Sequence, residues 1–199
     1  NGLPFNDTAK AGHRRLTTWG AGVDTQFFTP STAPKTQDFF VYFKSQNYNE
    51  LQELFVFLFN NYFRLRGSVY IYYHYDPVML RQAAQQSRFC IMLDRPETQG
   101  LAALEILACD CPMFVIDDTT FYGQEKAVCG VTSVTCWDSR CGLKSNKENY
   151  KKDLPTFLRG LDTYKPRDYV VETHSFQKSA EKLWSLMAAA AASSPVGTS

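Results

Sequence analysis

The sequence predicts an α/β domain built on a parallel β-sheet with helices on both faces. Short apolar runs typical of buried strands alternate with segments whose apolar residues recur at the i, i+3, i+4, i+7 spacing of amphipathic helices. The alternation repeats several times between residues 39 and 116, and such strand–helix–strand units form parallel sheets with right-handed crossovers. With 199 residues, the chain can build one domain with a full hydrophobic core.

The expected elements follow in order along the chain. Residues 39–43 form a continuous apolar run suited to a strand covered on both faces, and residues 49–64 follow as an amphipathic helix that we expect Gly67 to close in a left-handed C-cap. Further strands are expected at 68–73, 88–93 and 113–116, and helices at 77–86, which has Pro77 in its first turn, and at 99–109.

The last third of the chain is less regular. An irregular stretch follows Asp118, and we expect a strand at 131–136, a short helix at 154–161 and a last helix within 167–192. In terms of domains, residues 1–38, which are dense in Thr, Gly, Pro and Ala, are interpreted as a linker or entry segment. Residues 39–187 form the folded domain, and 188–199 a disordered tail.

The composition excludes several classes of protein. Apolar residues make up 44% and charged residues 21%, which excludes a disordered tail, a collagen-like chain and a coiled coil. The net charge of +1 provides no broad field for nucleic acid or an anionic membrane, so a bound anion must be held at a local site. There is no transmembrane run and no signal-peptide pattern, and we expect a cytoplasmic protein.

Six cysteines raise the question of disulfides or a metal. The spacings Cys109-x-Cys111 and Cys136-x4-Cys141 could in principle supply metal ligands, but neither matches a zinc ribbon or finger, and no histidine is near. We expect reduced thiols and no metal site.

Loops at the carboxyl ends of the expected strands are the natural ligand site of such a sheet. They span residues 44–48, 74–77 and 94–100, and the third leads into an almost wholly apolar helix. We expect Thr98 to cap this helix, and the first turn, Gly100-Leu101-Ala102, to offer free N–H groups and the positive end of the helix dipole to a phosphate.

Two carboxylates flank this helix start. Glu97 precedes it and Glu105 lies roughly 7–9 Å further along the axis, at about 1.5 Å per residue. The residues alone allow two interpretations: Glu97 interacts with the helix dipole while Glu105 is solvated, or the pair holds the two sides of a nucleotide-diphosphate sugar. Glu105 stands among apolar neighbours, so it needs a partner, which a ligand hydroxyl, a buried Arg or a backbone cap could supply.

The pattern Glu97-x7-Glu105, with Gly100 three positions after the first Glu and Pro112 beyond the helix, resembles the donor-binding signature of GT-B retaining glycosyltransferases, family 4 above all. This chain has Thr-Gln where the family pattern reads Gly-Phe after the first Glu. Residues 19–24 are similar to the segment by which the family's chain enters its C-terminal domain. Residues 132–142 and 164–167 are similar to the closing part of divergent, including virus-encoded, members.

The resemblance implies a Rossmann-like domain that forms one half of a GT-B fold. It implies a donor-binding domain of a retaining glycosyltransferase (EC 2.4 class) that binds a nucleotide-diphosphate sugar without metal or cofactor. The family's N-terminal acceptor domain would be the missing partner, so this chain alone would be incomplete for catalysis.

The resemblance also assigns roles to single residues. Glu97 would face the donor sugar and phosphates, and Lys44, just after the first strand, would neutralise the leaving diphosphate. For Lys44 the alternative is a solvated side chain at a strand end. The substrate-binding residues would be Glu105 at the ribose, Gly100 and Leu101 as backbone donors, Gln99 and Arg95 from the same loop, and His74 and Tyr75 at the nucleobase.

Two other functions stay open. A nucleotide-sugar epimerase uses the same two-domain fold, but it would want additional carboxylates and a histidine in the cleft. A non-catalytic nucleotide-binding or interaction module would keep the fold and lack the ligand.

Overall fold

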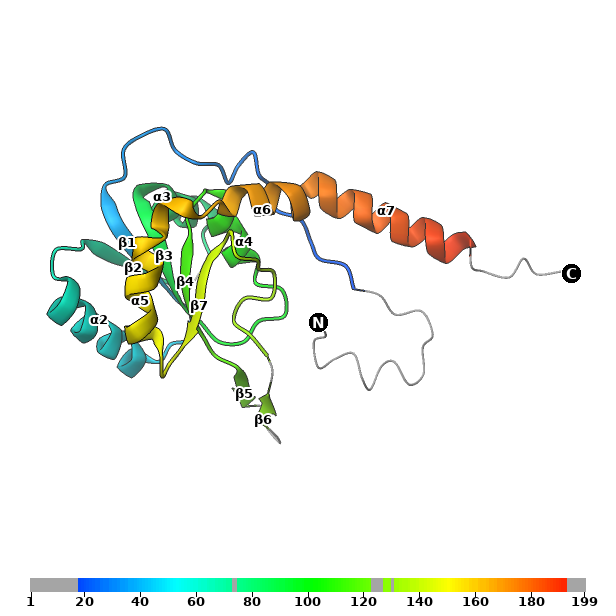
Figure 1. Cartoon of the computed structure of the whole chain (residues 1–199). Helices are drawn as coiled ribbons and strands as arrows, with labels where there is room; N and C mark the ends of the chain where they lie inside the picture. Colours follow the sequence, from blue (N-terminus) through cyan, green and yellow to red (C-terminus); the bar gives the residue numbers. More distant parts are fainter. Residues whose placement is uncertain (1–17, 73–74, 123–126, 130, 193–199) are drawn as a thin grey trace, which may run out of the picture.

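A parallel sheet forms the centre of the molecule (Figure 1). The computed structural model describes residues 18–72, 75–122, 127–129 and 131–192. Within them a five-stranded sheet has the order β2-β1-β3-β4-β7 and is parallel throughout. Its strands are β1 (Gln37–Phe43), β2 (Gly67–Ile71), β3 (Ser87–Leu93), β4 (Met113–Asp117) and β7 (Gly142–Asn146). The predicted fold class is confirmed.

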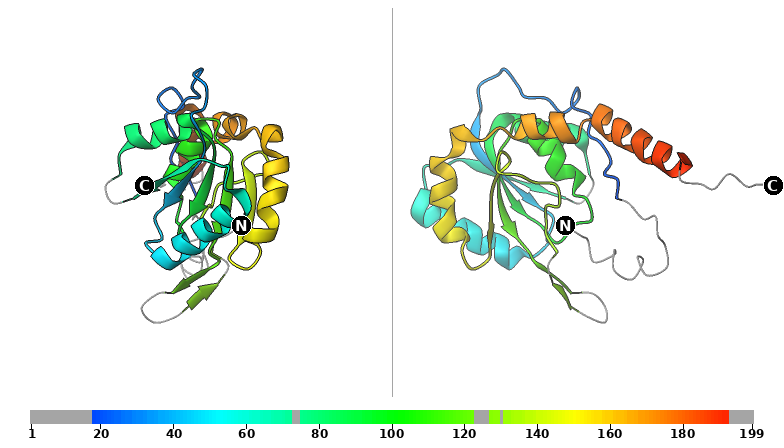
Figure 2. Two further views of the ribbon diagram at one scale, coloured as in Figure 1. Left: turned by 90° about the vertical axis from the view of Figure 1, so that its left-hand side faces the viewer. Right: turned by 45° about the vertical axis from the view of Figure 1, so that its right-hand side comes forward.

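Helices cover both faces of the sheet (Figure 2). α2 (Tyr48–Tyr62) and α5 (Tyr150–Arg159) pack against Phe39, Val41 and Phe43, which point to one face of β1. α3 (Pro77–Gln86), α4 (Leu101–Ala108) and α6 (Pro166–Thr173) cover the other face, where Phe40 and Tyr42 point. The short helix η1 spans Leu161–Thr163. Because successive residues of a strand point to opposite faces, a continuous apolar run is what a two-sided sheet requires.

The last helix differs from the sequence expectation. It is broken in two, since α6 ends at Thr173 and α7 (Phe176–Ala192) begins after a bridge between Val23 and Ser175. α7 projects away from the sheet (Figure 1) and contains residues 188–192, which were expected to belong to a disordered tail. None of the described helices is long and apolar enough to cross a membrane.

The strand predicted at 131–136 is wrong. These residues form a loop, in which the Asp117 carboxylate accepts hydrogen bonds from the Ser133 amide at 2.6 Å and from the Thr132 hydroxyl at 2.8 Å. The fifth strand is β7, in a sequence with no strand pattern. β5 (Thr120–Tyr122) and β6 (Ala127–Cys129) form an antiparallel pair in the stretch expected to be irregular. α5 begins four residues before the predicted helix at 154–161.

The predicted glycine cap of α2 is also wrong. The helix ends at Tyr62 with Phe63 as a right-handed C-cap, and Gly67 is the first residue of β2. A Cβ at Gly67 would lie 2.4 Å from the Phe39 ring, so this glycine is explained by a close approach and not by a turn.

The entry segment lies against the start of α7. The Trp19 indole Nε1 donates to the Ser179 carbonyl at 2.9 Å, and the Ser179 hydroxyl donates to the Gly20 carbonyl at 2.7 Å. Val23 and Phe28 are buried in the core on the α4 side of the sheet. Arg167 in α6 donates to the carbonyls of Thr25, Phe28 and Ala108 at 2.6–3.0 Å. Much of the expected linker therefore packs onto the domain.

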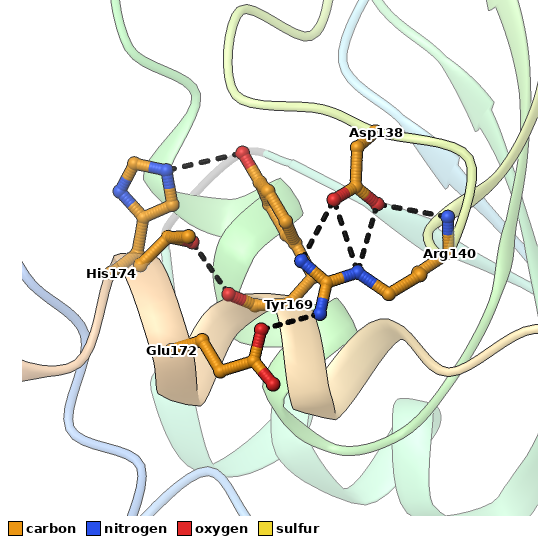
Figure 3. A network of polar contacts seen from close by, with 6 residues as sticks. Asp138, Arg140, Tyr169, Glu172 and His174 are labelled. Atoms are coloured by element: carbon orange, nitrogen blue, oxygen red, sulfur yellow. Dashed lines mark hydrogen bonds and ion pairs between the residues drawn. The ribbon is translucent and has the colours of Figure 1, made fainter.

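A polar network fixes the loop before β7 to α6 (Figure 3). Arg140 bridges Asp138 at 2.8 Å and Glu172 at 2.6 Å, and Tyr169 contacts His174 at 3.2 Å. The His174 carbonyl accepts from the Val23 amide at 2.8 Å. The network thus ends where the entry segment meets the break between α6 and α7.

Candidate functional site

A cavity of about 400 Å³ opens at the carboxyl ends of β1 and β3. The chain passes from β1 to β2 on one side of β1, and then crosses to β3 on the other side. The strand order therefore reverses between β1 and β3, and α/β sheets bind ligands at such a switch point. The lining residues come from the ends of β1 and β3, the segment after β2, the loop before α4, α4 itself and the loop at residues 131–135: Tyr42, Lys44, Tyr72, Tyr75, Met92, Asp94, Glu97, Thr98, Gln99, Gly100, Leu101, Ala102, Ala103, Glu105 and Ser133.

Lys44 lies between two carboxylates in this cavity. It forms an ion pair with Glu97, its Nζ is 4.0 Å from Asp94 Oδ2, and it lies 5.3 Å from the centroid of the Tyr72 ring. About a third of the Lys44 side chain is exposed, so a ligand can reach the ammonium group. The structure therefore brings together the two residues that the sequence proposed for catalysis.

Asp94 was not singled out from the sequence. It follows β3, its side chain is 4% exposed, and Oδ1 accepts from the Arg95 amide at 2.7 Å. Burial raises the pKa of Asp94 to about 6, although the nearby Lys44 ammonium acts in the opposite direction. The carboxyl group therefore titrates at a higher pH than an ordinary Asp, and it is mostly ionised at pH 7. Its only sequence signal was its position directly after a buried strand.

The start of α4 forms one wall of the cavity. Gly100 is the N-cap, with φ +72° in the left-handed region that glycine adopts without strain, and no side chain caps the helix, so the expected Thr98 cap is wrong. The Leu101 and Ala102 amides lie in the first turn, where N–H groups have no partner within the helix. Gly100, Leu101 and Ala102 all line the cavity, so the start of the helix lies where an anion could bind.

Hydrogen bonds from the 131–135 loop hold this wall in place. The Glu97 amide donates to the Thr132 carbonyl at 3.0 Å, and the Thr135 hydroxyl donates to the Gln99 carbonyl at 2.7 Å. The loop that replaces the expected strand is therefore a support for the segment before α4.

Glu105 lies at the other end of the cavity. Its Oε1 accepts a hydrogen bond from the Tyr75 hydroxyl at 2.6 Å, while its buried Oε2 has no hydrogen-bond partner in the described part of the chain. Burial raises the pKa of Glu105 to about 7, and the Tyr75 hydrogen bond lowers it in part. The sequence predicted that Glu105 needs a partner, but it did not identify Tyr75, which is 30 residues away.

Two predicted site residues, Arg95 and Gln99, differ from expectation in their contacts. Arg95 is not among the lining residues, and its Nε donates to the Ser45 carbonyl at 3.1 Å. Gln99 lines the cavity, but its amide pairs with both backbone groups of Ala21 at 2.8 and 3.1 Å and so holds the entry segment. His74 lies outside the described residues. The nucleobase role of His74 and Tyr75 stays a prediction.

The described residues contain no cluster of three or more His, Cys, Asp or Glu side chains that could hold a metal ion. Cys90, Cys109, Cys111, Cys136 and Cys141 are free thiols. Burial raises the pKa of Cys109 and Cys141 to about 12, which makes them unreactive at neutral pH.

These features define an α/β Rossmann-like domain that matches GT-B glycosyltransferases. The similar structures include a TarM variant from S. aureus in complex with fondaparinux, α-GlcNAc-glycerol and UDP, at 14% identity and a TM-score of 0.62, over 90% of this chain and 41% of that chain. Sucrose-phosphate synthase from Thermosynechococcus elongatus matches at 14% identity and a TM-score of 0.53, over 87% of this chain and 52% of its own. The pneumococcal O-GlcNAc transferase GtfA, in complex with UDP and GlcNAc, matches at 13% identity and a TM-score of 0.53, over 82% of this chain and 37% of its own.

This chain thus spans about half or less of the length of these three proteins. At such identities the likeness shows the fold. No protein-family model matches the sequence. No curated protein matches it either.

Proposed function

We propose that this chain is the donor-binding domain of a retaining GT-B glycosyltransferase and binds a nucleotide-diphosphate sugar. The observation that carries the proposal is the cavity at the switch point of the sheet. It gathers a cation, the first turn of a helix and a buried carboxylate oxygen that has no hydrogen-bond partner among the described residues. Its volume of about 400 Å³ is within the usual range for small-molecule sites.

The diphosphate would bind between Lys44 and the start of α4. There the Leu101 and Ala102 amides would donate hydrogen bonds, and the helix dipole would favour the negative charge. When the bond to the sugar breaks, negative charge grows on the departing diphosphate, and the Lys44 ammonium would stabilise it. Because Lys44 is paired with Glu97 in this structure, binding of the diphosphate would free Glu97 to accept hydrogen bonds from the sugar.

The ribose would bind at the far end of the cavity. The unpartnered Oε2 of Glu105 would accept its hydroxyl groups, which removes the cost of a buried acceptor without a donor. Retention at the anomeric carbon follows from the resemblance to family 4, and the acceptor would bind to a second domain. UDP is the first nucleotide to test, since two similar structures contain it. A cytoplasmic location stays a prediction.

Calorimetric titration with UDP-, GDP- and ADP-sugars, with and without Mg²⁺, tests the proposal. We expect one nucleotide to bind without metal and the affinity to be lost in Glu105→Ala and reduced in Glu97→Ala. Glu148→Ala, at an exposed position away from the cavity, is the matched control. If both cavity variants changed only stability, the chain would be a non-catalytic module.

Two further measurements separate the alternatives. If the chain bound none of the donors, the titration would be repeated with a protein that also contains an acceptor-binding domain, and a second failure would refute the proposal. Proton NMR of the bound sugar after incubation would detect inversion at one carbon, which is the result expected of an epimerase.

A further inference from the structure

Tyr75 and Glu105 form a hydrogen-bonded pair across the cavity. Tyr75 comes from the segment between β2 and α3 and Glu105 from α4, and the hydroxyl lies 2.6 Å from Oε1. The two oxygens of Glu105 therefore differ, because Oε1 is occupied by a donor from the protein while the buried Oε2 has none among the described residues.

The Tyr75 side chain is not a core residue. It is 41% exposed, and its ring lies 6.2 Å from that of Tyr72, which in turn is next to Lys44. The contact with Tyr72 sets the direction of the Tyr75 ring, and the hydroxyl at its end reaches the carboxylate. A hydroxyl so placed orients Glu105 without contributing much to the hydrophobic core.

A hydrogen bond donated to a carboxylate favours its charged form and fixes its rotamer. Among the described residues, the titratable groups that interact with Glu105 are Tyr75, Tyr70 from β2 and Cys109 just after α4, and none of these three is a cation. Tyr75 is therefore the group that offsets the effect of burial on this carboxylate.

We propose that Tyr75 is a positioning residue, whose hydroxyl holds one oxygen of Glu105 so that the other oxygen alone accepts the vicinal hydroxyls of the donor's ribose. This inference rests on the proposed function, and it gives Tyr75 a role distinct from contact with the nucleobase. It predicts that loss of the Tyr75 hydroxyl weakens only ligands that carry the ribose diol.

The test compares Tyr75→Phe with the wild-type chain, using UDP and 2′,3′-dideoxy-UDP in calorimetric titrations. Loss of one hydrogen bond to a charged group weakens binding about tenfold. We expect Tyr75→Phe to bind UDP about tenfold more weakly and dideoxy-UDP within about twofold of the wild type. Tyr62→Phe, on α2 and outside the cavity, is the matched control.

The pH profile provides a second measurement. UDP affinity should rise with pH as Glu105 ionises, and the midpoint should move to higher pH in Tyr75→Phe because the charged form loses its donor. Equal weakening of both ligands would overturn the proposal. Unchanged UDP affinity or tighter UDP binding would do so too.

A third measurement needs no ligand. The ¹³C carboxyl shift of Glu105, followed by NMR titration, gives its pKa directly, and we expect the pKa to be higher in Tyr75→Phe than in the wild type. If this shift occurs and no nucleotide binds, the positioning role stands and the proposed function fails. If the pKa of Glu105 is the same in both proteins, the positioning role is refuted, whatever binds.

Discussion

Replacing Glu105 by glutamine is expected to stabilise the folded protein at pH 8. Burial raises the pKa of Glu105 from 4.5 to about 7, so the folded protein holds this proton more tightly than the unfolded chain. Between these two values the folded state binds more protons, and its free energy of unfolding falls as the pH rises from 4.5 to about 7. The carboxylate is thus a cost to the fold that is fully present above about pH 7.

The size of this cost follows from the two pKa values. A change from 4.5 to about 7 corresponds to about 3 kcal/mol, and residual contact with solvent reduces it to about 2 kcal/mol. Glutamine cannot ionise and keeps an oxygen for Tyr75. At the Oε2 position, the described residues offer no hydrogen-bond partner to the glutamine amide. The same is true of the protonated carboxyl group of the wild type at low pH. The two proteins should therefore differ in stability only where Glu105 is charged.

Urea unfolding at pH 4.5, 6 and 8 measures the difference. We expect Glu105→Gln to be more stable by about 2 kcal/mol at pH 8, or about 6 °C in Tm, and equal to the wild type at pH 4.5. Glu148→Gln, at an exposed position, should show no such trend. A difference that is the same at all three pH values, or no difference at pH 8, would refute the reasoning.

Four further predictions concern close contacts and charges. Gly142→Ala should cost more than about 3 kcal/mol of unfolding free energy in urea, because its φ is +136° and a Cβ would lie 2.0 Å from the Met113 carbonyl oxygen. Gly160→Ala, whose Cβ would have no neighbour closer than 3.5 Å, should cost less than about 1 kcal/mol. Arg167→Met should lower the stability by about 2–4 kcal/mol in the same assay, since it removes the guanidinium that donates to three carbonyls. Lys44→Met should weaken UDP binding at least about tenfold and flatten its salt dependence, and wild-type affinity in this variant would exclude Lys44 from the diphosphate site.

The sheet could be predicted because its central strands, β1, β3 and β4, are buried on both faces. Residues 39–43 and 89–93 are apolar throughout, and this pattern has few other uses in a globular protein. The failure at 131–136 has a physical cause: the β-branched residues favour a strand, but the Asp117 carboxylate binds the Ser133 amide and keeps the segment in a loop. β7 contains Gly, Lys, Ser and Asn, and is a strand only because β4 provides a neighbouring edge.

The site could be predicted only in part for a similar reason. Lys44, Glu97 and Gly100 follow strands or begin a helix, and the topology of a parallel sheet brings such positions to one edge. The pairing of Tyr75 with Glu105, and the turn of Arg95 toward Ser45, depend on side-chain directions that no spacing records.

The contact between the entry segment and α7 has a consequence for how the protein is made. Trp19 and Ser179 are 160 residues apart in the chain, so their hydrogen bond closes almost the whole described domain into one loop. Contacts of such high sequence separation form late in folding. At about 5–20 residues per second, synthesis needs roughly 10–30 s to pass from one partner to the other. During that interval the growing chain must keep Trp19 from wrong partners, and the contact that closes the domain can form only after α7 has been synthesised.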